Sequence, residues 1–533
     1  MPTITVDKRE LLRLIGKKVA DEQLKERIPM LGTQLEAWEG NDIIIEVFPN
    51  RPDMLTEEGL ARALSSFLNI KTGLRTYKVN ASSYRCTIDP KVKKVRPAVA
   101  CAVIKNINMD DATIKSIMDM QDKLTLTHGR NRKKVAIGIH DADTITFPLT
   151  YTTKPRNFEF TPLEGKKPYT LNQILELHPK GREFGDIIKQ YSEFPIWIDK
   201  RGQVLSMPPI INAEETKITS STKNLFIDIT GTDQQAVEQA LNIIVANCAD
   251  RGGKIYKVNN FPDMNPKKIK INLQEINKRL GISISAQQAK KLLERMGMTL
   301  QGTTVLYPAY RTDILHPIDI LEDIAISYGY ENFTPTIPRV ATIAEEDTFE
   351  KMKNKLMELL IGLGITEVST YHLVNKESQT TYMRSKNECV AIMNPKSAEY
   401  NVLRNQMLPS LLEVLKNNKQ YEYPQKIGES GVVFIKNKEE AHLAIAIADT
   451  TANFTQMRQI IDAIISSLKL KVTIKEKDHP SFITGRTAAW IMNNKEIAVF
   501  GEMHPEVLSN FQLETPVAAC ELNLSELKRI CKE

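Results

Sequence analysis

The spacing of apolar residues divides the start of the chain into short strand and helix segments. Residues 3–6 (TITV) fit a strand, and residues 8–16 (KRELLRLIG) and 21–32 (DEQLKERIPMLG) carry apolar side chains at helical spacing. Glycine closes both helical runs, as is common at helix C-termini. The pattern predicts a small α+β module over residues 1–80.

Strand and helix patterns continue through the rest of the chain. Strands are expected at 96–104, 134–140, 194–198 and 225–231, followed by a long helix at 232–250. They indicate an α/β or α+β domain over residues 85–258, and the turn-rich stretch NNFPDMNPKK at 259–268 reads as a linker. A second small α+β module is predicted at 268–335. The last domain, 345–533, is predicted to begin with a helix at 347–364 and to contain strands at 367–374, 442–448 and 487–492.

Composition narrows the class of protein. The 533 residues suggest three or four domains, and 42% hydrophobic with 26% charged residues is ordinary for a soluble globular chain. The net charge of +6 permits nucleic-acid contact without requiring it. Six cysteines without a CxxC pair argue against zinc ribbons and a disulfide framework. Without a signal core or an apolar run near 18 residues, we expect a cytoplasmic protein that does not enter a membrane.

An internal repeat links the two small modules. Residues 6–35 align without gaps to residues 271–300, which pairs Gly16 with Gly281 and Gly32 with Gly297. After one inserted residue the match continues from 48–64 to 307–324. The repeat predicts two modules of one design, although two unrelated helical hairpins could also agree by accident.

The second copy carries acids that the first copy lacks. Arg51 and Asp53 meet Arg311 and Asp313, but Gly59, Arg62 and Ala63 stand opposite Asp319, Glu322 and Asp323. We therefore expect these acids to serve something other than folding.

The acidic residues are predicted to share one face of a helix that begins near Pro317. Asp319, Glu322 and Asp323 stand at i, i+3 and i+4, and Asp313 lies just upstream. The opposite side is assigned to Ile318, Leu321, Ile324 and Ala325. Hard oxygen ligands without nearby histidine or cysteine suit Mg²⁺. The alternative is an acidic first turn on a solvated face, stabilised by the helix dipole.

Several separated motifs resemble the beta subunit family of phenylalanyl-tRNA synthetase, in its archaeal and eukaryotic form. They are YRTDILHPIDILEDIAISYGYENF (310–333), MNPKSAEYNVLRNQMLPSLLEVLKNN (393–418), HPSFITGRTA (479–488) and FGEMHPEVLSNFQLE (500–514). The resemblance implies an α+β multidomain fold: two helical-hairpin α+β modules, an α/β editing-type domain, and an antiparallel-sheet domain similar to a class II synthetase core that has lost its active site. Residues 345–533 indeed show no Arg-x-Glu on a recognisable motif-two strand.

The resemblance also implies partners. A ligase of two alpha and two beta chains is expected, in which the alpha subunit attaches phenylalanine to tRNA(Phe) with ATP and Mg²⁺. The family's magnesium site maps onto Asp313, Asp319, Glu322 and Asp323.

The same resemblance implies that residues 85–258 hydrolyse tyrosine wrongly attached to tRNA(Phe). An apolar pocket rejects an added hydroxyl only weakly, so a second site must select for it. The expected pocket residues are Ser206, Pro208, Pro209, Asn212, Asp228 and Thr230. Basic residues of HGRNRKK (128–134) are expected to contact the tRNA backbone. The alternatives are an ordinary proline turn, a solvated basic loop, and Thr232 as a simple helix cap.

Two other functions remain open from the sequence. A freestanding nucleic-acid-binding protein would use the repeated helical hairpins, although their second helices carry mixed charge rather than a basic stripe. A deacylase acting alone in trans would leave residues 345–533 without a role.

Overall fold

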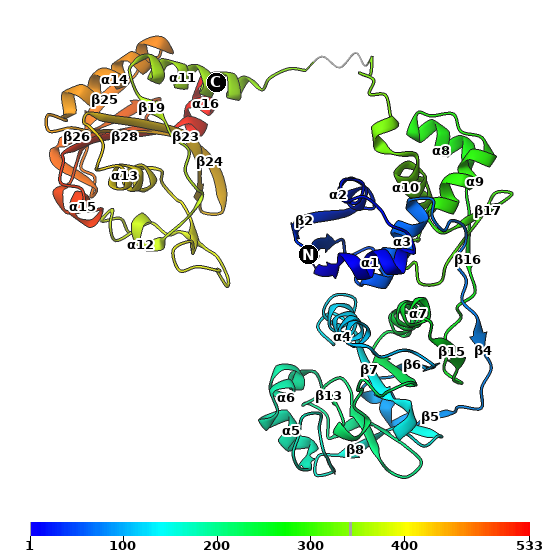
Figure 1. Cartoon of the computed structure of the whole chain (residues 1–533). Coiled ribbons are helices and arrows are strands. Elements are labelled where there is room, and N and C mark those ends of the chain that lie inside the picture. The colour runs from blue at the N-terminus through cyan, green and yellow to red at the C-terminus, as the bar shows by residue number, and fades with distance from the viewer. Residues whose placement is uncertain (1, 340–343, 533) are drawn as a thin grey trace. The chain divides into compact units, whose positions relative to one another are not determined.

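The structure, a computed structural model, describes residues 2–339 and 344–532 and divides the chain into two compact units. The first unit is Met1–Ile337 and the second is Pro338–Glu533 (Figure 1). The three regions that the sequence separates before residue 337 pack as one unit. Leu11 and Leu60 of the first module share one apolar core with Leu241 and Ile244 of the middle domain. The second module has a core cluster of its own and joins the larger core through Tyr310.

The N-terminal module places two helices and a third, longer helix against a small antiparallel sheet. The sheet order is β1-β3-β2. Its elements are β1 (Thr3–Asp7), α1 (Lys8–Ile15), α2 (Asp21–Met30), β2 (Thr33–Glu39), β3 (Asp42–Val47) and α3 (Glu57–Phe67). The strand and the two helices expected from the sequence are therefore present.

The second module repeats this design, as the sequence repeat predicts. Its sheet order is β16-β18-β17, the same as in the first copy. Its elements are β16 (Lys267–Lys270), α8 (Leu273–Leu280), α9 (Ala286–Arg295), β17 (Thr299–Gln301), β18 (Thr304–Tyr307) and α10 (Pro317–Tyr328). Gly16 and Gly281 end their helices at φ +83° and +67°, so both copies stop the first helix with a left-handed residue.

The middle domain consists of two stacked five-stranded sheets with orders β13-β12-β11-β8-β5 and β4-β15-β6-β14-β7. The strands are β4 (Val79–Asn80), β5 (Cys86–Ile88), β6 (Ala98–Lys105), β7 (Val135–Asp141), β8 (Leu149–Pro155), β11 (Glu193–Ile198), β12 (Val204–Met207), β13 (Ile211–Asn212), β14 (Leu225–Gly231) and β15 (Lys254–Lys257). The short pair β9 (Glu159–Phe160) and β10 (Tyr169–Thr170) stands apart.

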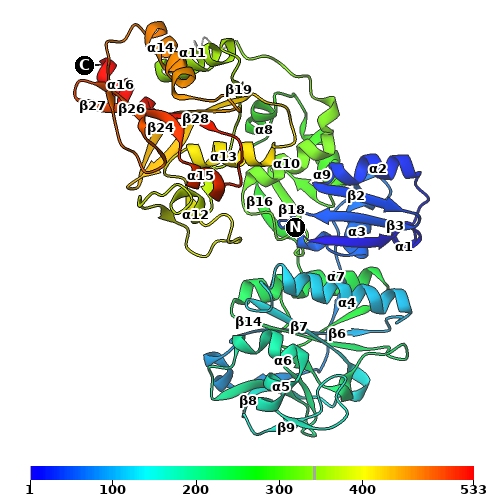
Figure 2. The ribbon, with the colours of Figure 1, turned by 90° about the vertical axis from the view of Figure 1, so that its left-hand side faces the viewer.

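Helices pack on both sheets. α4 (Asp111–Leu126) and α7 (Gln234–Asp250) pack on the sheet that contains β14, and α5 (Leu171–Leu177) and α6 (Pro179–Phe184) pack on the other. Figure 2 shows α4 and α7 lying along the sheet that contains β14. Between the sheets, Trp197 stacks on Tyr151 at 4.9 Å and meets Phe226 edge-on at 5.9 Å. The even-numbered side chains of β14 therefore point toward the opposite sheet, away from α4 and α7.

The second unit is built on a seven-stranded sheet of order β19-β23-β24-β28-β27-β26-β25, antiparallel except for the edge pair β19–β23. Its strands are β19 (Thr366–Glu367), β23 (Gln425–Ile435), β24 (Lys438–Ala448), β25 (Thr473–Glu476), β26 (Phe482–Met492), β27 (Lys495–Met503) and β28 (Val517–Asn523). One face carries α11 (Thr348–Gly362), α14 (Phe454–Ser467) and α16 (Leu524–Lys532), and the other carries α13 (Leu408–Asn417) and α15 (Pro505–Asn510).

One sequence expectation for this unit is wrong. The strand predicted at 367–374 is only two short pieces, the end of β19 and β20 (Leu373–Val374), separated by irregular chain. β20 joins a small sheet with β22 (Val402–Leu403) and β21 (Val390–Ala391), beside the one-turn α12 (Lys376–Gln379). The apolar alternation at 367–374 does not mark a buried face, because Tyr371 is 77% exposed and Leu373 41%.

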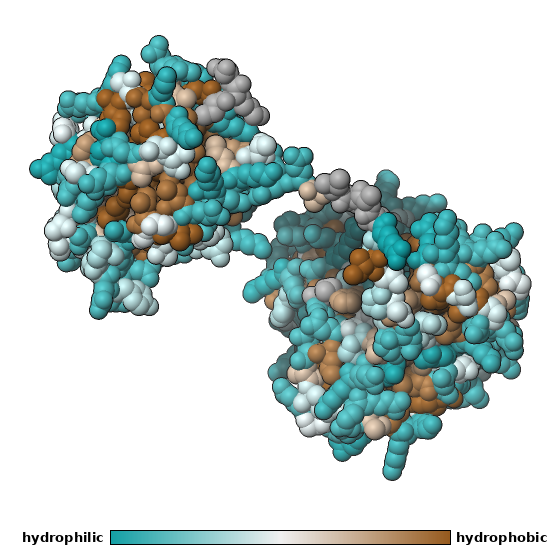
Figure 3. All heavy atoms as spheres, turned by 90° about the horizontal axis from the view of Figure 1, so that it is seen from above, coloured by the Kyte–Doolittle hydropathy of each residue, from teal (hydrophilic) through white to brown (hydrophobic). Residues whose placement is uncertain are grey.

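Figure 3 shows hydrophilic and apolar side chains mixed on the visible face of each unit. Among the helices of the described residues, none combines the length and apolar character needed to cross a membrane.

Candidate functional site

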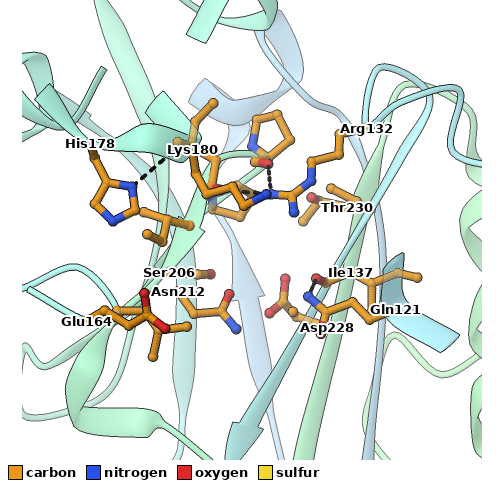
Figure 4. A pocket seen from close by; sticks show the side chains of 17 residues that line it. Gln121, Arg132, Ile137, Glu164, His178, Lys180, Ser206, Asn212, Asp228 and Thr230 are labelled. Atoms are coloured by element: carbon orange, nitrogen blue, oxygen red, sulfur yellow. Dashed lines mark hydrogen bonds between the residues drawn. The ribbon is translucent and has the colours of Figure 1, made fainter. Parts of the chain in front are cut away.

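The middle domain contains a cavity of about 180 Å³ whose walls come from both sheets and from the α5–α6 segment. All six pocket residues predicted from the sequence line it: Ser206, Pro208, Pro209, Asn212, Asp228 and Thr230. Figure 4 shows Ser206 and Asn212 on one wall and Asp228 on the wall opposite them. The structure thus brings together residues from two segments of the chain that are about 20 positions apart.

Strand geometry puts these side chains in place. Ser206 on β12 is paired with Asn212 on β13, and the intervening turn holds Pro208 and Pro209. Asp228 and Thr230 alternate on β14 with Ile227 and Ile229, which pack toward the helices. Two polar groups therefore face the layer between the sheets, where the cavity lies.

One polar group of the cavity has no partner. Ser206 is 2% exposed, and its hydroxyl forms no hydrogen bond with any residue that the structure describes. A buried hydroxyl without a partner costs free energy, which a bound polar group would relieve. The side of the cavity that Ser206 lines is therefore suited to a ligand with a hydrogen-bonding atom.

Thr230 is fixed from behind by a buried arginine. Arg96 Nε donates to Thr230 Oγ1 at 3.0 Å, and Arg96 Nη2 donates to Thr230 O at 2.9 Å and to Arg132 O at 3.0 Å. Burial lowers the pKa of Arg96 to about 10, so the guanidinium stays protonated at neutral pH. Asp228 is the acid whose charge acts favourably on this buried cation.

The cations of the basic loop 128–134, which the sequence predicts to contact tRNA, have different surroundings. Arg132 turns inward: its Nη1 donates to Ile210 O at 2.8 Å, and its guanidinium lies 4.1 Å from the centre of the Phe184 ring. Arg130 and Lys133 are exposed, whereas Lys134 pairs with Asp233 at 3.1 Å. The loop therefore builds one wall of the cavity and also leaves two cations open to solvent.

Thr232 does not cap the following helix, as one sequence alternative held. The N-cap of α7 is Asp233, whose carboxylate accepts from Ala236 N at 3.0 Å. Thr232 is exposed and lies outside the cavity lining.

The four acids of the second module do not converge. Arg311 binds Asp313 through two hydrogen bonds of 2.8 and 2.7 Å and binds Asp323 at 2.7 Å. Asp319 instead accepts from the backbone nitrogens of Leu315 and His316 at 2.8 and 2.7 Å. Within residues 2–339 and 344–532, no group of three or more such side chains is placed to hold a metal ion.

This arrangement corrects the predicted faces of α10. Asp323 is buried at 3% exposure, whereas Ile318, assigned to the apolar side, is 41% exposed. The acids opposite Gly59 and Ala63 also have structural roles, because Asp319 caps its own helix and Asp323 compensates a buried cation. Of the four acids, Glu322 is the exposed one, and it accepts a hydrogen bond from the Tyr330 hydroxyl at 2.9 Å.

Arginine–aspartate pairs stand at equivalent places in the two copies. Arg51 and Asp53 form the same two-bond pair, at 2.8 and 2.9 Å, and Arg51 and Arg311 line one small cavity between the two modules. The N-caps Thr56 and His316 correspond as well. Gly59 is required in the first copy because a Cβ there would lie 1.7 Å from Asp53 O.

Comparison with known proteins covers nearly the whole chain. Three family models match: the B3/4 domain at 81–246, the tRNA synthetase B5 domain at 269–330, and the phenylalanyl tRNA synthetase beta chain CLM domain at 334–524. The phenylalanine–tRNA ligase beta subunit of Archaeoglobus fulgidus is 40% identical over 98% of both chains, and that of Pyrococcus horikoshii is 39% identical over 99% of this chain and all of its own. The chain belongs to the family of phenylalanine–tRNA ligase beta subunits. A solved N-terminal fragment of the phenylalanyl-tRNA synthetase beta subunit from Pyrococcus horikoshii, 39% identical, covers 62% of this chain and all of the fragment with a TM-score of 0.59.

The cavity also contains residues that the sequence analysis did not single out. Gly138 on β7 and Gln121 on α4 line it beside Asp228, and His140 supports Asp228 from behind. The signal in the sequence that could have pointed to Gly138 and His140 is their presence inside the apolar run KVAIGIH. Their role becomes visible only when β7 is paired with β14.

Proposed function

We propose that this chain supports the attachment of phenylalanine to tRNA(Phe) as the partner of an alpha subunit, which carries the ATP-dependent chemistry. Family membership supports this assignment, since relatives are beta subunits of a phenylalanine–tRNA ligase. The expected assembly contains two chains of each kind. Co-purification of the native protein tests it: recovery without a second, class II synthetase-like chain would contradict the proposal.

We further propose that the cavity hydrolyses tyrosine that has been attached to tRNA(Phe) by mistake. The observation that carries this proposal is the unpartnered, buried Ser206 hydroxyl in a cavity of about 180 Å³. That volume is well below the roughly 300–1,000 Å³ of pockets for drug-sized ligands, so it suits one amino-acid side chain. A tyrosine hydroxyl would give Ser206 the partner that phenylalanine cannot supply.

The reaction requires few components. Water adds to the carbonyl carbon of the aminoacyl ester, the ester C–O bond breaks, and free tyrosine leaves while the terminal ribose regains its hydroxyl. Asp228 and Asn212 supply an acceptor and an amide next to the place where the amino acid would lie. The exposed cations Arg130 and Lys133 suit contact with the phosphate backbone.

Two variants test this function in the complete ligase. Asp228→Ala should slow hydrolysis of Tyr-tRNA about tenfold or more while the rate of Phe-tRNA synthesis stays unchanged. Ser206→Ala should weaken hydrolysis without lowering the stability of the free protein, because its hydroxyl has no partner there to lose. Ser221→Ala, an exposed serine of the same domain, is the matched control. Equal loss of hydrolysis and synthesis would indicate misfolding and contradict the proposal.

We also propose that α10 takes part in binding Mg²⁺, with a narrower set of residues than the sequence suggested. Mg²⁺ usually keeps several waters and takes only one or two carboxylates, which suits Asp319 and Glu322, the two acids that are not bound to Arg311. Asp313 and Asp323 would then act through Arg311 by fixing the helix. The carboxylates would hold the ion at the surface, and it would supply positive charge there.

A magnesium titration of the assembled ligase tests this site. Asp319→Asn with Glu322→Gln should raise the Mg²⁺ concentration needed for aminoacylation, whereas Asp186→Asn, an exposed acid of the middle domain, should not. An unchanged titration in the double variant would rule out the role in metal binding.

A further inference from the structure

A chain of three buried polar side chains leads from the cavity wall into the middle domain. Asp228 Oδ2 lies 2.9 Å from His140 Nε2, and His140 Nδ1 lies 2.9 Å from Thr216 Oγ1. His140 is fully buried and Thr216 is 1% exposed. Of the three, Asp228 is the residue that lines the cavity. The chain therefore presents a carboxylate to the ligand and keeps its other members out of contact with it.

The sheet makes room for this contact at one position. Gly138 on β7 is the register partner of Asp228 on β14, and His140 follows two residues later on the same face. A Cβ at position 138 would lie 2.2 Å from Asp228 Oδ2 and 2.9 Å from His140 Nε2. Gly138 is thus required for the carboxylate and the imidazole to meet.

The donor and acceptor capacities of Asp228 and His140 determine which of them carries the hydrogen in their bond. An ionised Asp228 can only accept, so His140 Nε2 must carry a hydrogen. In a neutral imidazole, Nδ1 then accepts from the Thr216 hydroxyl. In an imidazolium, Nδ1 donates to that hydroxyl, whose own hydrogen is then donated to Leu205 O at 3.4 Å. Either way Oδ2 is occupied, and the second carboxylate oxygen remains for a ligand.

A hydroxyl, an imidazole and a carboxylate form nucleophilic triads in other proteins, but here their order excludes that role. A threonine nucleophile would have to reach the cavity, whereas Thr216 is buried behind His140 and Asp228 stands at the front. The geometry suits the positioning of an acid.

We propose that His140 is a positioning residue for Asp228: its Nε2–H holds one carboxylate oxygen so that the other accepts a hydrogen bond from the aminoacyl group of the tRNA. Thr216 in turn fixes the imidazole. The inference rests on the proposed hydrolysis and identifies what orients its acid. A carboxylate that is fixed at one oxygen meets the ligand in a single orientation. Such fixed orientation raises the rate of the reaction, because fewer unproductive arrangements are sampled.

Two substitutions separate the two ring nitrogens. In His140→Gln the amide can reach the place of Nε2 and still donate to Asp228, whereas in His140→Asn it reaches only the place of Nδ1. For Tyr-tRNA hydrolysis by the complete ligase, we expect kcat to fall about 10- to 100-fold in His140→Asn and to stay within about threefold in His140→Gln. KM should change little in both, because the tRNA contacts are unaltered. Equal losses in the two variants would overturn the proposal.

Asp228→Asn, measured in parallel, separates this inference from the function beneath it. If Asp228→Asn hydrolyses Tyr-tRNA at the wild-type rate, the proposed function itself fails. If Asp228→Asn is slow but His140→Asn is not, only the positioning role fails.

Variants of Thr216 test the positioning role independently if His140→Asn does not fold. Thr216→Val should lower kcat at least threefold, and Thr216→Ser, which restores the hydroxyl, should recover it. A wild-type rate in a folded Thr216→Val variant would overturn the proposal.

Discussion

Replacing Arg311 by methionine should destabilise the second module strongly. The Arg311 side chain is 3% exposed and holds Asp313 and Asp323, whose side chains are 11% and 5% exposed. The variant would leave two buried carboxylates facing each other without this cation. Removing one partner of a buried ion pair typically costs about 3–5 kcal/mol, so we expect a loss of that size at pH 7.

The cost should depend on pH. Burial acts to raise the pKa of Asp313, but the Arg311 guanidinium outweighs it and holds the pKa at about 2, below the usual 3.8. A lowered carboxyl pKa contributes stability that is complete above about pH 4 and is lost as the pH falls toward 2, here about 2.5 kcal/mol. For Asp323 the burial prevails and raises the pKa, which offsets part of this gain. Without Arg311 both acids would take up protons more readily, so the variant's deficit should shrink between pH 7 and pH 4.

Hydrogen exchange measured by mass spectrometry on the full chain provides the assay. Protection of α10 (Pro317–Tyr328) should fall by two orders of magnitude or more, while α14 (Phe454–Ser467) in the other unit serves as the internal reference. Arg279→Met, which breaks an exposed pair with Glu275, is the matched control and should cost at most about 0.5 kcal/mol. A deficit below about 1 kcal/mol, or one that is equal at pH 7 and pH 4, would refute the argument.

Three further predictions follow from single contacts. Gly138→Ala should reduce Tyr-tRNA hydrolysis about tenfold or more in deacylation assays, because the added Cβ would displace Asp228. Gly185→Ala is the control and should not reduce it, because a Cβ there meets ordinary packing at 3.4 Å. Equal rates in the two variants would contradict this prediction. Asp319→Ala should lower stability by about 1 kcal/mol in thermal unfolding through loss of the cap, and an unchanged Tm would show that the cap is dispensable. Burial raises the pKa of Glu57 to about 7, so folding stability should fall by about 2 kcal/mol as the pH rises from 5 to 8, and Glu57→Gln should abolish that slope in urea titrations.

Local sequence signals predicted the repeated modules well. Gly16 and Gly281 stop helices with a left-handed residue in both copies, a conformation that depends mainly on the residue itself. The shared sheet order follows from the same succession of strand and helix patterns. Such features depend on neighbours in the chain, so they can be read without knowing the tertiary structure.

The sequence failed where a side chain's partner lies on another element. A helical wheel placed Asp323 with Asp319 and Glu322, but it could not show that Arg311 would draw Asp323 into the core. It also could not show that Ile318 would face outward. The inner face of α10 is set by the position of Arg311, which lies before the helix begins.

The cavity illustrates the same limit. The resemblance supplied all six of its predicted residues, because they lie in two continuous motifs. His140 and Gly138 come from a third segment and act through the pairing of β7 with β14. Antiparallel register between distant strands is not contained in either strand's own pattern.

Comparing the two copies shows which acid of α10 the fold leaves unexplained. Asp313 repeats Asp53, Asp319 caps its helix, and Asp323 joins Arg311, so Glu322 is the one of the four without a structural task beyond its bond to Tyr330. In the first copy the equivalent residue, Arg62, is buried and binds Asp250 at 2.6 Å and Asn247 at 3.1 Å on α7 of the middle domain.

Arg62 therefore attaches the first module to the middle domain, whereas Glu322, its counterpart in the second module, faces solvent. Three apolar side chains within eight residues of Glu322 in the sequence are exposed: Leu315 is 80% exposed, Ile318 41% and Tyr330 59%. Exposed apolar side chains that gather with a polar rim are typical of a surface that another chain covers. The repeated design thus supports Glu322 as the acid closest to the proposed alpha partner, with Asp313 and Asp323 holding the helix that presents it.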